Sequence, residues 1–133
     1  MVPVLPRCAA VAAAGGALLL LTGCSSVERP DVEHVATAFE DPSGDPQARC
    51  DLLVPATRTA FEQNRSAPCG EAIRDLPLQG GAVRSVQIWG GDAQVRLDGD
   101  TVFLTQTGSG WKVAAAACTP REEAPYDCEV EGP

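Results

Sequence analysis

Cationic side chains are scarce in this chain. Its 133 residues include ten Lys and Arg against eighteen Asp and Glu, which gives a formal net charge of −8 at pH 7. Nucleic acids and anionic lipid headgroups carry the same sign of charge, so both repel an acidic protein. The composition therefore excludes nucleic-acid binding as the expected function. It also predicts that the folded part stays at a membrane only through a covalent tether.

Histidine and metal-binding spacings are equally sparse. His34 is the single histidine, and it lies far in sequence from every cysteine; no two cysteines are spaced as C-x-x-C. Asp92, Asp98 and Asp100 lack the spacing of an EF-hand loop. We therefore expect no metal ion and no other cofactor. The three aspartates are interpreted as turn residues of two hairpins.

Few side chains suggest catalysis. No serine has the context of a nucleophile elbow. His34 has two interpretations: a surface residue of a helix, which the sequence favours, or a general base paired with a carboxylate in a pocket. Among the few aromatic residues, Trp111 is expected in the core. Trp89, followed by Gly90-Gly91, is a candidate for a residue exposed at a rim that contacts a ligand or partner, although the sequence does not favour this interpretation.

Long hydrophobic runs are absent except at the start of the chain. Arg7 is followed by an apolar or small stretch over 8–21, which is shorter than the roughly 20 residues that a membrane span needs. A positive start, a short apolar run and a small-residue exit are typical of a secretory signal. We therefore expect a helical signal peptide over residues 1–23.

The exit sequence Leu21-Thr22-Gly23-Cys24 resembles the lipobox of bacterial lipoproteins. In that family a diacylglycerol is attached to the cysteine sulfur, and a peptidase then cuts in front of the cysteine. The resemblance implies that Leu21, Thr22 and Gly23 form the cleavage motif and that lipidated Cys24 holds the protein on the extracytoplasmic face of the cell membrane. Residues 24–30 would form a short tether. The alternatives are a soluble secreted protein with a chance cysteine and, less favoured, an uncleaved signal anchor.

Four cysteines remain in the exported part: Cys50, Cys69, Cys118 and Cys128. An even number of cysteines in an exported domain indicates disulfides. Four cysteines allow three pairings. We favour Cys50–Cys69 and Cys118–Cys128, because the members of each pair are near in sequence and lie in the same half of the chain.

The periodicity of apolar residues changes in the middle of the mature chain. Val32, Val35, Ala36 and Phe39 form one helical stripe within 31–40, and further short helices are expected after Pro46, Pro55 and Pro68. After Gly80-Gly81 the period becomes two, and four strands are expected at 82–89, 93–98, 101–107 and 111–118. An acidic N-terminal region is interpreted as a solvated face; it comprises Glu28, Asp31, Glu33, Glu40, Asp41 and Asp45.

Helices followed by strands predict an α+β fold. We expect N-terminal short helices packed on a curved four-stranded antiparallel meander, in a single domain over 31–133. The acidic C-terminal tail of this domain would be closed by Cys118–Cys128.

This arrangement resembles small nuclear-transport-factor-2-like (cystatin-like) domains of bacterial lipoproteins. The resemblance covers about residues 31 to 118 and rests on Ala48-Arg49-Cys50-Asp51-Leu52-Leu53, Pro55-Ala56-Thr57-Arg58, Ala67-Pro68-Cys69, the hairpin over 95–104, and Gly110-Trp111-Lys112-Val113. It implies a cone in which helices clasp a curved sheet around a pocket. That fold hosts enzymes, binding proteins and structural modules alike.

We predict a non-catalytic, membrane-anchored module that binds a partner or a small ligand. The alternatives are a cone-fold enzyme that acts on a small apolar molecule through His34, and a purely structural module.

Overall fold

The structure is a computed structural model that describes residues 27–123 and 125–133. The predicted signal-peptide helix, the motif Leu21-Thr22-Gly23 and Cys24 lie outside the described residues. Within those ranges, no helix has the length and apolar character needed to cross a membrane.

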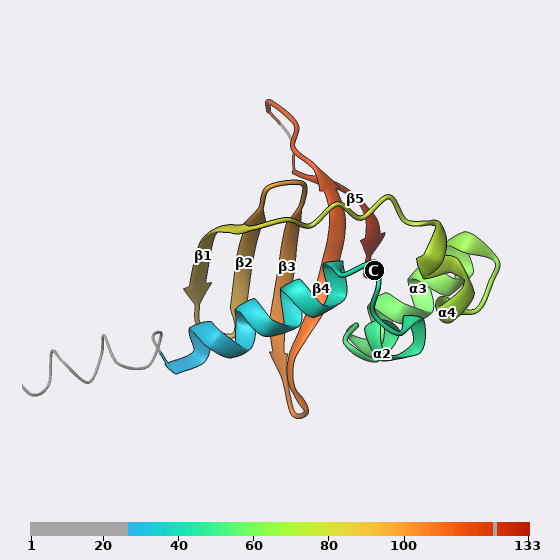
Figure 1. Cartoon of the computed structure of the whole chain (residues 1–133), viewed down its shortest axis with the longest axis horizontal. Coiled ribbons are helices and arrows are strands. Elements are labelled where there is room, and N and C mark those ends of the chain that lie inside the picture. The colour runs from blue at the N-terminus through green and yellow to red at the C-terminus, as the bar shows by residue number, and fades with distance from the viewer. Residues whose placement is uncertain (1–26, 124) are drawn as a thin grey trace, which may run out of the picture.

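The described strands form one open antiparallel sheet in which every strand pairs with its neighbours in sequence (Figure 1). Its members are β1 (Val83–Trp89), β2 (Asp92–Leu97), β3 (Thr101–Thr107), β4 (Gly110–Thr119) and β5 (Asp127–Glu131). The α+β class and the meander are confirmed. The prediction of four strands is wrong, because the acidic tail adds β5. This strand has a single buried apolar residue, Val130, too weak a pattern to reveal a strand in the sequence.

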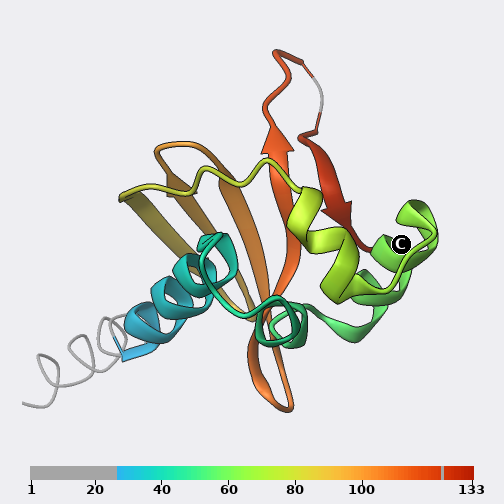
Figure 2. The same ribbon diagram turned by 45° about the vertical axis from the view of Figure 1, so that its right-hand side comes forward.

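A helix that includes residues 27–40 crosses one face of the sheet (Figures 1 and 2). Val32, Ala36 and Phe39 are fully buried on its inner face, as the stripe predicts. The expectation that the helix lies within 31–40 is wrong at its start, since the helix already includes Val27. Its first described turns gain an ion pair at a spacing of four residues between Arg29 and Glu33. The last four residues of the predicted tether are therefore helical.

The short helices gather beside β4 and β5 (Figure 1). They are α2 (Pro46–Asp51), α3 (Pro55–Arg65), α4 (Cys69–Ala72) and the 3₁₀ turn η1 (Ile73–Asp75). Asp45 caps α2 by accepting a hydrogen bond from the Ala48 N–H at 2.8 Å, and Pro46 occupies the first turn. A proline at this position removes an N–H that has no partner inside the helix. The expected starts of these three α-helices, after Pro46, Pro55 and Pro68, are thus confirmed.

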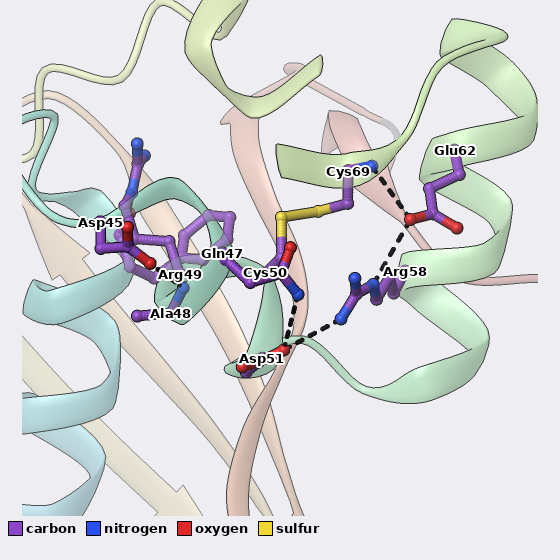
Figure 3. The surroundings of a disulfide bond; sticks show 10 residues. Asp45, Gln47, Ala48, Arg49, Cys50, Asp51, Arg58, Glu62 and Cys69 are labelled. Atoms are coloured by element: carbon purple, nitrogen blue, oxygen red, sulfur yellow. Dashed lines mark hydrogen bonds and ion pairs between the residues drawn. A yellow bond between two sulfur atoms is a disulfide. The ribbon is translucent and has the colours of Figure 1, made fainter. Parts of the chain in front are cut away.

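Two disulfides hold this arrangement, and they are the predicted pairs. Cys50–Cys69 joins α2 to α4, and Cys118–Cys128 joins paired positions of β4 and β5. Around the first bond, the Glu62 carboxylate accepts a hydrogen bond from the Cys69 N–H at 2.9 Å (Figure 3). Arg58 forms ion pairs with both Glu62 and Asp51, so it links α3 to the end of α2.

Candidate functional site

Strand β4 has two different neighbours along its outer edge. In its first half, the Val54 N–H donates to the Val113 carbonyl at 2.9 Å, and the Val113 N–H donates to the Leu52 carbonyl at 2.8 Å. In its second half, from Ala115 onward, β5 takes over the pairing. The two neighbours therefore leave a junction beside the middle of β4.

A bulge lies at this junction. Phe103 pairs with Ala115 while Leu104 pairs with Val113, which leaves Ala114 as an extra residue in β4. The Thr57 hydroxyl donates a hydrogen bond to the freed Ala114 carbonyl at 3.0 Å and so fixes the first turn of α3 against the sheet. Thr57 is buried and Ala56 is exposed. The apolar pattern of this helix would place Ala56 inward, but the polar anchor of Thr57 sets the rotation of α3 and leaves Ala56 exposed.

An apolar groove of about 570 Å³ opens at the junction. Its size is within the range of small-molecule sites, which is about 300 to 1,000 Å³. Phe103 and Tyr126 form an aromatic wall, with ring centroids 5.2 Å apart in an edge-to-face arrangement. We call this cavity the β4–β5 groove; it is lined by Val54, Ala56, Thr57, Phe103, Ala114, Ala115, Pro125, Tyr126, Cys128, Glu131, Gly132 and Pro133.

The alanines of β4 explain why the groove is open. Ala114 and Ala115 present only methyl groups to it, so neither fills the space between α3 and the aromatic wall. Ala115 is buried, and no residue of the helix over 27–40 lines the groove. The resemblance to cone-like domains would place a pocket in the layer between the helix over 27–40 and the sheet. The observed groove lies outside that layer.

Glu131 is the charged side chain along the groove. It is exposed, and it makes that part of the groove negative. A carboxylate at the border of an apolar site disfavours anionic ligands. The groove is thus suited to a neutral or cationic apolar molecule.

A second site is polar and lies under the end of the helix over 27–40, where Glu40 is only 2% exposed. Within the described residues neither carboxyl oxygen of Glu40 has a hydrogen-bond partner at ordinary distance. Burial, together with the adjacent Asp100 carboxylate, raises the pKa of Glu40 to about 9. The expectation of a solvated Glu40 is wrong. It continues the stripe of Val32 and Ala36 at spacings of four, a signal that the sequence did contain.

Asp100 is the structural partner of this site. Its carboxylate accepts hydrogen bonds from the N–H groups of Thr101 at 2.7 Å, Ala117 at 2.7 Å and Cys118 at 2.8 Å. Ala117 has a left-handed backbone, with φ of 54°, at the position whose N–H bonds Asp100. The turn interpretation of Asp100 is therefore incomplete, because this residue ties the β2–β3 turn to the last part of β4.

Arg49 supplies the positive charge near this pair. Its side chain is buried, and Nε donates a hydrogen bond to the Phe39 carbonyl at 2.8 Å, near the end of the helix over 27–40. A cation at a helix C-terminus is favourable. The charge of Arg49 lowers the pKa of Glu40, but it does not outweigh burial and Asp100. The site therefore holds a proton on Glu40 at neutral pH.

Glu40→Gln is expected to stabilise the fold by up to about 3 kcal/mol at pH 7. Folding raises the pKa of Glu40 from its ordinary value of 4.5 to about 9. At pH 7 the folded state therefore retains a proton that the unfolded state releases. The free energy of unfolding should consequently fall as pH rises between these two values. Denaturant unfolding from pH 5 to 9 measures this slope, which should be smaller in the variant.

The matched control is Asp31→Asn on the exposed side of the same helix. It removes one carboxylate without touching the buried pair and should leave the pH slope unchanged. Equal slopes in wild type and Glu40→Gln would contradict a protonated Glu40.

The remaining predicted site residues are dispersed. Trp89 is half-exposed at the end of β1, on the opposite edge of the sheet from β5, and Trp111 is buried in the core as expected. His34 is exposed and lines none of the cavities described above. Asp98 is a turn residue whose pKa is held low by Arg84 and the Ala82 N–H.

Within residues 27–123 and 125–133, no group of three or more His, Cys, Asp or Glu side chains is placed to hold a metal ion. Comparison of the chain with models of protein families, with curated proteins and with solved structures found no match.

Proposed function

We propose that this protein is a lipid-anchored module of the cell envelope that binds a small apolar molecule in the β4–β5 groove. The observation that carries the proposal is the groove itself, a hollow of about 570 Å³ with an aromatic wall and an alanine floor. Apolar cavities of this size with few polar groups are the usual form of small-molecule sites.

The anchoring part of the proposal is supported by the sequence. The apolar run, its length and the sequence Leu21-Thr22-Gly23-Cys24 agree on one processing site. Two acyl chains on Cys24 would hold a domain whose net negative charge gives it no affinity of its own for anionic headgroups.

Binding rather than catalysis is proposed because of the chemistry of the groove. Its wall and floor are apolar side chains, and the hydroxyl of Thr57 is used to hold α3. The enzymatic alternative requires His34 and a carboxylate to converge in a pocket. The exposed position of His34 does not support that arrangement.

Titration with N-phenyl-1-naphthylamine, a neutral apolar fluorophore, tests the groove. The wild type should bind the probe with increased fluorescence. Ala56→Glu places a carboxylate at an exposed groove position, and it is expected to weaken binding by about ten-fold, because a charge disfavours an apolar occupant.

The matched control is Thr59→Glu. It adds the same charge to an exposed position of the same helix, but outside the groove lining. It should bind the probe as the wild type does. Equal affinities of the two variants, or a wild type that does not bind the probe, would show that the groove is not a ligand site.

A further inference from the structure

Two large apolar side chains are exposed in the described part of the chain, and they are Val27 and Trp89, with 75% and 50% of their surfaces accessible. Trp89 is the last residue of β1, and Val27 lies in the first described turn of the helix. β1 is the edge of the sheet opposite β5, which packs against α3, and in Figure 1 the first described turn of the helix lies toward the β1 edge. The exposed apolar surface is thus at one end of the molecule.

The turn after Trp89 is exposed. A Cβ added at Gly90 or at Gly91 would meet no atom within 4 Å, so nothing covers this turn in the described structure. It is nevertheless fixed: the Gly91 carbonyl accepts hydrogen bonds from the Gln106 N–H at 2.7 Å and from the Thr105 hydroxyl at 3.2 Å. Trp89 is therefore held next to an exposed turn of two glycines, whose lack of side chains leaves its ring accessible to a flat surface.

The proposed lipid attachment lies at this same end. Only Ser25 and Ser26 separate Cys24 from Val27. Three consecutive Cα–Cα steps span at most about 11 Å, so a bilayer that holds Cys24 lies within that reach of the first described turn. Tryptophan is the side chain most favoured at the level of lipid headgroups, because its ring is apolar and its N–H is polar.

We infer that the end formed by Val27, Trp89 and the Gly90-Gly91 turn rests on the lipid bilayer and orients the anchored domain. This inference rests on the proposed anchoring by Cys24. The partner is the interfacial layer of a membrane, which Trp89 enters while the acidic surface stays in water. β1 and β5 are opposite edges of the sheet, so the β4–β5 groove lies away from the bilayer and takes its ligand from the aqueous side.

The test uses the mature lipidated protein reconstituted in phosphatidylcholine vesicles whose acyl chains carry bromine, a quencher of tryptophan fluorescence. The chain has two tryptophans, so Trp111→Phe leaves Trp89 as the single emitter. We expect about a two-fold loss of its emission relative to vesicles without bromine. In both kinds of vesicle its emission maximum should be blue-shifted relative to that of tryptophan in water.

The second single-tryptophan variant, Trp89→Phe, keeps the experiment decisive if Trp111→Phe does not fold. Trp89→Phe retains only Trp111, which is buried in the core, so it should show no quenching by brominated lipid. If Trp89 is quenched only by acrylamide in the water phase, as in a soluble protein, the inference is overturned. Protection of Trp89 from acrylamide in the intact envelope without quenching by lipid would overturn it too, because the occupant would then be a protein.

Flotation of the same vesicles separates this inference from the anchoring proposal. Protein that fails to float with the lipid contradicts the anchor itself. Protein that floats while Trp89 is not quenched keeps the anchor and refutes only the orientation.

Discussion

Cys24→Ala is expected to move the whole protein from the membrane fraction to the soluble fraction and to abolish its labelling by a fatty-acid analogue. Without the sulfur, no thioether to diacylglycerol can form, and the acidic domain has no comparable attraction to anionic headgroups. The contact inferred for Trp89 and Val27 is too small to replace two acyl chains. Metabolic labelling followed by fractionation of the cells measures both effects.

Cys8→Ala provides the matched control, since it removes the other cysteine of the leader. It should leave lipid labelling and membrane association unchanged. Lipid on the Cys24→Ala protein would refute the anchoring proposal, because another residue would then carry the lipid.

Asp100→Ala is expected to destabilise the fold by about 3 to 5 kcal/mol. The substitution leaves the N–H groups of Thr101, Ala117 and Cys118 without their acceptor. It also removes a charge that raises the pKa of Glu40, so the dependence of stability on pH should become weaker. Denaturant unfolding of wild type and variant at pH 5 and pH 9 measures the loss and the change in slope.

Two further variants show whether the hydrogen bonds carry the effect. Asp100→Asn keeps one acceptor oxygen and should cost less than the alanine variant. Asp92→Ala removes an exposed aspartate at the opposite end of β2 and should change stability by no more than about 0.5 kcal/mol. Asp100→Ala with the stability of Asp92→Ala would mean that the three N–H groups find water instead.

Local interactions explain what could be predicted for the fold. Pro46, Pro55 and Pro68 mark helix starts because a proline suits the first turn, and alternating residues mark strands because successive side chains point to opposite faces. The pairs Cys50–Cys69 and Cys118–Cys128 followed from nearness in sequence. Each of these signals acts over a few residues, or over one short loop.

The groove could not be predicted in the same way. Ala114 and Ala115 lie in the strand predicted over 111–118, and nothing local shows that α3 docks there through Thr57 or that β5 pairs alongside. A cavity is what several packed elements leave unfilled, so its position depends on all of them together.

The sequence by itself determined the disulfide pairs, the starts of α2, α3 and α4 and the order of the first four strands, because proximity and periodicity along the chain suffice for each. Only the tertiary structure decided that Glu40 is buried against Asp100, that β5 joins the sheet and that a groove opens between α3 and β5. The physical reason is that the pKa of a carboxyl and the shape of a cavity depend on neighbours distant in sequence. Glu40 and Asp100 are sixty positions apart in the chain and share one buried environment in the fold.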